Sequence, residues 1–96
     1  MTHRVRILKR AQGDIEELHA YALRDAPLIA ARFIGDVIES LGSFPHRGAV
    51  PRDDRLREAG YRFVVFHERL IFYKVGPRSV HVYRVLHGRQ SYQHLL

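Results

Sequence analysis

Residues 61–87, YRFVVFHERLIFYKVGPRSVHVYRVLH, decide the fold. Three runs rich in aromatic and β-branched residues, Tyr61–Phe66, Arg69–Val75 and Ser79–His87, are separated by two short connections. The connections, His67-Glu68 and Gly76-Pro77-Arg78, have the length that joins antiparallel strands in tight hairpins. The stretch therefore predicts a three-stranded antiparallel meander. We expect its buried face to be formed by Val64, Phe66, Ile71, Tyr73, Val80, Val82 and Leu86, although the register could replace some of these with Phe63, Val65 and Phe72.

Two amphipathic helices are predicted before the meander. Apolar residues recur at helical spacing from Arg10, and Pro27 restricts the residue before it, so the first helix should end near Asp25. A second helix should begin near Leu28 and end at Gly42. The short connection makes the two helices antiparallel neighbours. The residues that we expect to be buried and to fix the second helix to the sheet are Phe33, Val37 and Leu41.

The first residues of the chain complete the order of elements. Residues 2–8, THRVRIL, alternate between apolar and basic side chains and predict a strand. Residues 45–60 carry turn and charge signals without a period, which indicates a loop with room for one helical turn. The order β-α-α-β-β-β predicts an α+β fold in which a helical hairpin packs on one face of a small, mostly antiparallel sheet.

Length and composition indicate one globular domain. The chain has 96 residues, of which 46% are hydrophobic and 27% charged, as in ordinary soluble domains. No apolar run approaches the ~20 residues of a membrane helix, so we expect no association with a membrane. The chain contains no cysteine, which excludes disulfides and thiolate metal sites and fits a cytoplasmic location.

Positive charge is concentrated in the first ten residues and in the second half of the sequence. The net charge is +6, and 14 of the 16 cationic residues are arginine. Residues 1–10 carry four cations and no acid, residues 11–45 sum to −4, and residues 46–96 sum to +6. The planar guanidinium group suits phosphate and carboxylate groups. This pattern suggests a polyanionic or acidic partner for one face, although a solvated basic surface would give the same pattern.

Five segments, in order and covering nearly the whole chain, resemble the RelE/ParE family of toxins from bacterial type II toxin–antitoxin systems. They are AQGDIEELHAYA, LGSFPHRG, LREAGYR, ERLIFYKV and VYRVLHGRQ. The resemblance implies a helical hairpin against a curved antiparallel sheet. It also implies a partner, a cognate antitoxin that wraps and silences the toxin. RelE-like members cut messenger RNA in the ribosome, whereas ParE-like members poison DNA gyrase.

The RelE-like interpretation would require a set of catalytic residues. Metal-independent attack by a 2′-hydroxyl needs a proton acceptor, a cation at the phosphorus and a proton donor for the leaving oxygen. Arg69 lies near the position of a catalytic arginine in RNase members, Arg62 follows AGY, and His87 ends the last strand where some RNase members place a histidine. If the chain is an RNase, we therefore predict that Arg62, Arg69 and His87 are catalytic.

The end of the chain favours the ParE-like interpretation. Gly88 follows His87, where RNase members of this type tend to carry an aromatic residue, and RVLHGRQ resembles the ParE-type ending. We therefore predict a protein that binds DNA gyrase, with a binding surface formed by Arg84, Arg89 and Tyr92. Two structural interpretations stay open: His87 could bond to backbone, and Arg62 and Arg69 could pair with Glu58 or Glu68.

The remaining predictions concern cofactors, partners and the tail. His81 and His87 lie six residues apart on one predicted strand, roughly 20 Å when extended, too far to share a metal ion. We expect no cofactor, and an antitoxin that forms a hetero-oligomer with the chain. A relative that has lost toxicity and binds its antitoxin alone is a third possibility. Leu95 and Leu96 are predicted to pack back against the sheet and so to hold the segment from Gly88.

Overall fold

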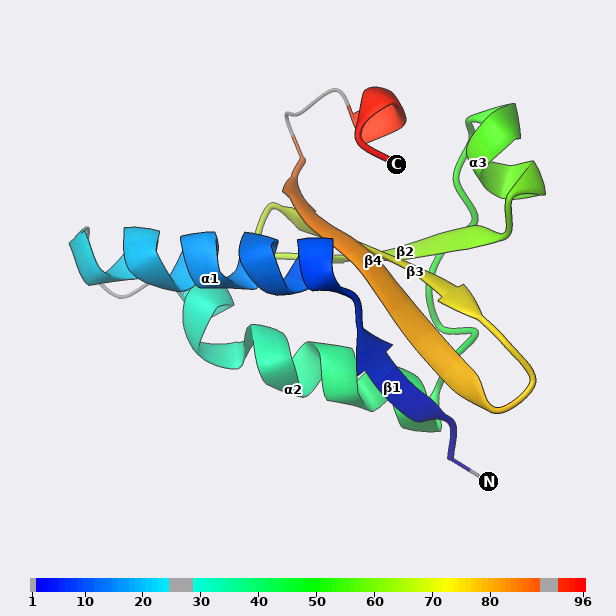
Figure 1. Ribbon diagram of the computed structural model, residues 1–96, viewed down its shortest axis with the longest axis horizontal. Coiled ribbons are helices and arrows are strands. Elements are labelled where there is room, and N and C mark those ends of the chain that lie inside the picture. The colour runs from blue at the N-terminus through cyan, green and yellow to red at the C-terminus, as the bar shows by residue number, and fades with distance from the viewer. Residues whose placement is uncertain (1, 25–28, 89–91) are drawn as a thin grey trace.

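The elements follow the predicted order in the computed structural model, which describes residues 2–24, 29–88 and 92–96, with the backbone alone at 21–24, 29–32 and 93 (Figure 1). They are β1 (Arg4–Ile7), α1 (Lys9–Arg24), α2 (Ile29–Ser43), α3 (Asp54–Glu58), β2 (Tyr61–Phe66), β3 (Arg69–Val75), β4 (Ser79–His87) and a 3₁₀ turn (Tyr92–His94). The three strands of the meander have the predicted bounds. The predicted end of the first helix at Asp25 and start of the second at Leu28 lie outside the described residues.

The four strands form one mixed sheet in the order β1-β4-β3-β2. β2, β3 and β4 pair antiparallel as a meander, and β1 pairs with β4 in parallel. Parallel strands need a long crossover connection. Here the connection from β1 to the meander is long enough because it contains α1 and α2. His67 and Glu68 form the β2–β3 turn with φ of 46° and 66°. Two successive positive φ angles match the right-handed twist of the flanking strands.

A bulge in β4 shifts the alternation of side chains between the two faces. Phe72 pairs with Arg84 and Tyr73 pairs with Val82, so Tyr83 is an extra residue in β4. An extra residue reverses the phase of the strand beyond it. Val85 therefore faces the helices, and the prediction that Leu86 would lie on that face is wrong: Leu86 belongs to the opposite face.

The larger core lies between the two long helices and one face of the sheet. It contains Ala11, Leu18, Ile34, Ile38, Leu41, Ile71, Tyr73, Val80, Val82 and Val85. Leu41 is buried as predicted and Val37 packs against this core. Phe33 is 43% exposed, so its predicted burial is wrong. The buried stripe of α2 runs through Ile34 and Ile38, one residue further along the helix, which places Phe33 beside the stripe.

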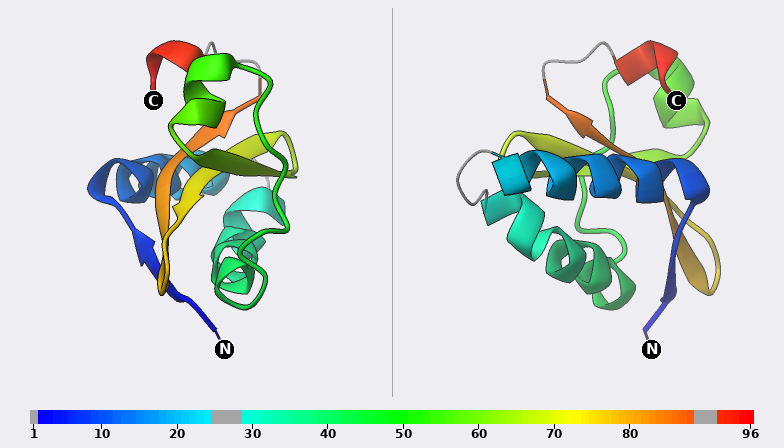
Figure 2. Two further views of the ribbon diagram at one scale, coloured as in Figure 1. Left: turned by 90° about the vertical axis from the view of Figure 1, so that its right-hand side faces the viewer. Right: turned by 60° about the vertical axis from the view of Figure 1, so that its left-hand side comes forward.

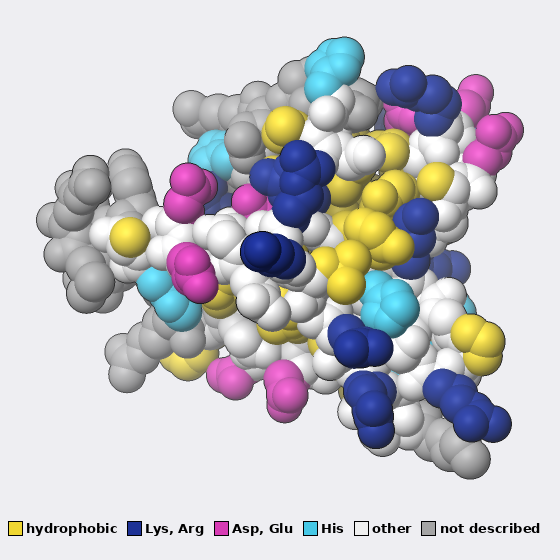
Figure 3. All heavy atoms as spheres, viewed as in Figure 1, with side chains coloured by type: hydrophobic (Ala, Val, Ile, Leu, Met, Phe, Trp, Pro, Cys, Tyr) yellow, Lys and Arg dark blue, Asp and Glu magenta, His cyan; other side chains and the backbone are white. Residues whose placement is uncertain are grey.

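A second core covers the other face of the sheet. Its buried residues are Leu56 of α3, Tyr61, Phe72 and Leu86, and Leu95 and Leu96 pack against them, as predicted. Asp53 caps α3 by accepting a 3.1 Å hydrogen bond from the backbone N–H of Leu56. α3 and the C-terminal turn lie together at the end of the molecule away from α2 (Figure 2). On the face drawn in Figure 3, hydrophobic side chains gather over the strands beside α3.

Candidate functional site

The end of β4 meets the β2–β3 turn, and this contact brings two of the predicted catalytic residues together. Arg69 is paired across the sheet with His87. The Gly88 N–H donates a 2.7 Å hydrogen bond to the Glu68 carbonyl, and His87 Nε2 lies 3.7 Å from Glu68 Oε2. We call Glu68, Arg69 and His87 the hairpin cluster. A Cβ on Gly88 would lie 3.3 Å from the Glu68 carbonyl oxygen, so glycine allows the strand end to approach the turn closely.

Arg62 lies away from the hairpin cluster. It sits four residues before Phe66 on β2, and Phe66 pairs with Arg69, which puts Arg62 about 13 Å along the strand from the cluster. Its Nη1 donates to the carbonyls of Gly48 at 2.8 Å and His46 at 3.3 Å. Within the described part of the chain, neither Arg62 nor Arg69 forms an ion pair with Glu58 or Glu68.

The segment that Arg62 holds is also fixed by a buried tyrosine, which the sequence did not identify as a polar contact. The Tyr73 hydroxyl donates to the Pro45 carbonyl at 2.8 Å and accepts from the Gly48 N–H at 2.9 Å. Burial raises the pKa of Tyr73, although the Gly48 N–H and nearby arginines oppose this, so the hydroxyl keeps its proton for the bond to Pro45. The sequence feature that could have indicated this contact is Gly48 in LGSFPHRG. A residue without a side chain allows a close neighbour, and Tyr73 approaches Gly48 closely.

Arg84 joins three parts of the fold. Its Nε and Nη2 donate to the two carboxylate oxygens of Asp14 at 2.8 and 3.0 Å, and its Nη1 donates to the Leu95 carbonyl at 3.1 Å. Asp14 also accepts from the Val85 N–H at 2.9 Å. The two side chains are 16% and 11% exposed. The hydrogen bond with Asp14 raises the pKa of Arg84 against the opposing effect of burial. We call Asp14, Arg84 and the Leu95 carbonyl the clasp.

The clasp gives Asp14 a role that sequence reasoning missed. Asp14 lies in the first half of α1, and its hydrogen-bond partner Arg84 lies 70 residues away in the chain. The other two residues predicted for the binding surface are Tyr92 and Arg89. The Tyr92 ring packs with its centroid 5.1 Å from that of Phe72, so Tyr92 belongs to the second core. Arg89 lies outside the described residues.

Residues 5–92 match the family described as "ParE toxin of type II toxin-antitoxin system, parDE". The match covers the hairpin cluster, Asp14 and Arg84 of the clasp, β2 to β4, and all of β1 except Arg4. The chain belongs to the ParE toxin family. Among the described residues of this ParE family member, no three His, Asp or Glu side chains gather as metal ligands. None of its described helices is long and apolar enough to cross a membrane.

Two solved structures are similar to this ParE family member in fold. One is a chromosomal ParDE toxin–antitoxin system from P. aeruginosa, with 13% identity, a TM-score of 0.71, and coverage of 90% of this chain and 96% of that chain. The other is a RelBE toxin–antitoxin complex from Mycobacterium tuberculosis, with 22% identity, a TM-score of 0.66, and coverage of 91% and 99%. The search of curated proteins found no match. The fold is therefore shared with structures of both ParDE and RelBE systems.

Proposed function

We propose that this ParE family toxin inhibits growth by binding DNA gyrase and is neutralised by a cognate antitoxin. The observation that carries the proposal is the separation of the groups that an RNase would need. Arg62 lies about 13 Å along β2 from the hairpin cluster and bonds to two backbone carbonyls. Cleavage at one phosphate needs its acid, base and cation within hydrogen-bond reach of the same group.

A second candidate function, a RelE-like mRNA interferase, is favoured by the hairpin cluster itself. Arg69 and His87 are cross-strand neighbours, and a carboxylate lies 3.7 Å from the imidazole. A histidine near neutral pH can exchange protons, and an adjacent arginine can stabilise a charged phosphorane. The cluster thus offers two of the three groups that metal-independent RNA cleavage needs.

The antitoxin is the partner that the exposed surface fits. The chain carries a net charge of +6, and large apolar side chains are exposed at Phe33, Phe44, Val50 and Val65. Val65 lies on β2, an edge strand that is bridged to Ala49 at Phe63 and can accept another strand beyond that bridge. We expect an acidic, amphipathic antitoxin segment that covers these surfaces by helix docking or strand addition, in a hetero-oligomer. Because gyrase acts on the chromosome inside the cell, the proposed function also implies a cytoplasmic location, which we propose with it.

Induction in bacterial cells tests the proposed target against the alternative. Cells expressing the chain should activate a reporter of DNA damage while transcripts stay intact, because a blocked gyrase breaks DNA. His87→Ala should weaken growth inhibition without abolishing it. The matched control is Arg55→Ala, which changes an exposed residue of α3. Transcript cleavage that is lost in His87→Ala and retained in Arg55→Ala would instead establish the interferase.

A further inference from the structure

The first strand and the β3–β4 turn form a cationic surface that the proposed function does not use. Val5 and Ile7 pack against the larger core, so Arg4 and Arg6 point away from the helices. Arg4 is paired across the sheet with Ser79, and Arg6 with His81. His81 is in turn paired with Lys74. Basic side chains therefore cross three neighbouring strands on the face opposite the helices.

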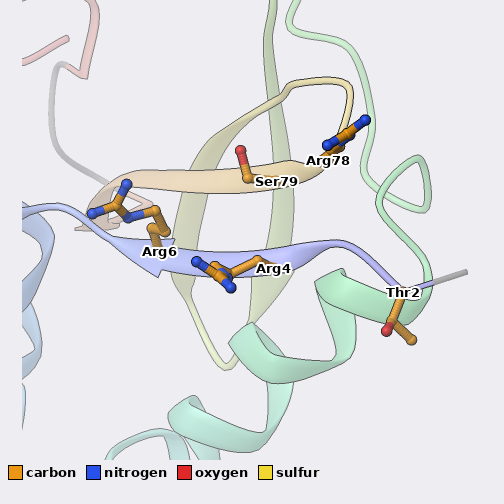
Figure 4. A pocket seen from close by; sticks show the side chains of 5 residues that line it. All are labelled: Thr2, Arg4, Arg6, Arg78 and Ser79. Carbon is orange, nitrogen blue, oxygen red and sulfur yellow. The ribbon is translucent and has the colours of Figure 1, made fainter.

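Part of this surface is hollowed into an open pocket of ≈ 500 Å³ at the edge of the sheet. Figure 4 shows its lining: Arg4 and Arg6 on β1, Thr2 before them, and Arg78 and Ser79 where β4 begins. The Arg4 N–H donates to the Arg78 carbonyl at 2.9 Å, which fixes the turn against β1. The three arginines are exposed, and none of them pairs with another described side chain.

The charged side chains that line the pocket are all positive. Its lining contains three guanidinium groups and no carboxylate. Figure 3 shows Lys and Arg side chains gathered beside the N-terminus, while the Asp and Glu side chains on this face lie elsewhere. Because the arginines are held on a strand and a tight turn, little backbone freedom is lost when they bind. Such a site favours a ligand that presents several anionic groups along a line.

We propose that Arg4, Arg6, Arg78 and Ser79 form a binding site for the phosphate backbone of a DNA duplex. Arg4 and Arg6 are two residues apart on one strand, which spaces their Cα atoms by about 6.8 Å and allows each to meet a different phosphate of one strand. Ser79 adds a hydroxyl, which is a common donor to phosphate oxygens. The binding is electrostatic and independent of base sequence.

The composition of the face favours a duplex over a single strand. Proteins that bind single strands combine cations with exposed aromatic rings on which bases stack. The lining has no aromatic residue. Two tyrosine rings lie beside Lys74 in the row of cations, those of Tyr61, which is buried, and Tyr83. The Lys74 ammonium lies 4.5 and 4.9 Å from the centroids of these rings. A duplex keeps its bases stacked inside and offers phosphates alone.

The proposed DNA site is separate from the hairpin cluster. Ser79 and His87 lie at opposite ends of β4, eight residues and about 25 Å apart. The pocket arginines take no part in the clasp, and their side chains are exposed. Substitutions in the pocket should therefore leave the fold, and whatever the hairpin cluster does, unchanged.

Fluorescence anisotropy with a labelled DNA duplex tests the site in the purified full-length chain. The variant R4E/R78E should weaken duplex binding at least about tenfold and lower the slope of log affinity against log salt by about 2. The matched control, R52E/R55E, removes the same charge from exposed residues near α3 and should change affinity far less. Circular dichroism shows whether each variant is folded. If R4E/R78E does not fold, R4Q/R78Q is measured in its place.

Three results would overturn the proposal. An equal loss of affinity in both double variants would mean that net charge alone drives binding. A single-stranded oligonucleotide of the same length that binds as tightly as the duplex would contradict the argument from the absent aromatic rings. Polyglutamate that displaces the duplex at matched charge concentration would assign the pocket to an acidic peptide.

Discussion

At the scale of single residues, Gly48 has the least room for a side chain among the described glycines. A Cβ there would lie 2.5 Å from the Tyr73 hydroxyl oxygen and 2.8 Å from the Phe63 carbonyl oxygen. Gly48→Ala must push the backbone around residue 48 away from β2 and weaken the hydrogen bonds that Tyr73 and Arg62 make to it. The substitution should lower the free energy of unfolding by about 1–3 kcal/mol. Gly35→Ala is the control, because nothing lies within 4 Å of its added Cβ, and it should stabilise α2 slightly. Urea unfolding measures both, and equal stabilities would contradict this placement.

Arg84 and Asp14 should be strongly coupled, because the clasp is shielded from solvent. Arg84→Met leaves Asp14 with its charge unpaired, and we expect a loss of roughly 1–3 kcal/mol. A double-mutant cycle with Asp14→Ala should give a coupling energy of at least about 1 kcal/mol. Arg57 and Asp54 provide the matched exposed pair in α3, for which the coupling should lie near zero. Additive effects at Arg84 and Asp14 would mean that the clasp does not stabilise the fold.

At the scale of elements, α2 is fixed to the sheet by a narrow stripe of buried apolar side chains, Ile34, Ile38 and Leu41. Leu41 is fully buried between α2 and the strands, so Leu41→Ala should cost about 2–5 kcal/mol, much of the stability of a domain of this size. Phe33→Ala removes a larger side chain that is 43% exposed, and it should cost less than half as much. Thermal unfolding of both variants tests the stripe, and an unchanged melting temperature in Leu41→Ala would refute it.

Most elements could be predicted from local patterns, whereas their contacts could not. The strands of the meander follow from alternation and from turns whose lengths fit hairpins. The bulge at Tyr83 depends on which residues of β3 and β4 pair, so the face of Leu86 could not be deduced from one strand. The clasp joins Asp14 to Arg84 across 70 residues, too far for a local pattern to indicate. Arg62 donates hydrogen bonds to backbone carbonyls, and every residue has one, so the residue types around it gave no hint. Residue type therefore indicated candidates for the site, and tertiary structure decided their roles.

At the scale of the whole molecule, the C-terminal turn closes the second core. Deleting residues 91–96 removes Tyr92, Leu95 and Leu96 from that core, and it takes the Leu95 carbonyl from Arg84. We expect a loss of roughly 2–4 kcal/mol from the exposed apolar area, together with weaker growth inhibition, because the end of β4 loosens. The control is His94→Ala, which changes an exposed residue of the same turn. Full toxicity and unchanged stability of the truncation would contradict this role.

Supercoiling by DNA gyrase in a purified system is the most direct test of the proposed function. The wild-type chain should inhibit the supercoiling of relaxed plasmid in proportion to its concentration, and an equimolar cognate antitoxin should restore it. Ribosomes programmed with a defined transcript, assayed alongside, should leave that transcript intact. Gyrase that stays fully active at saturating toxin, while the transcript is cut in the ribosome, would contradict the account.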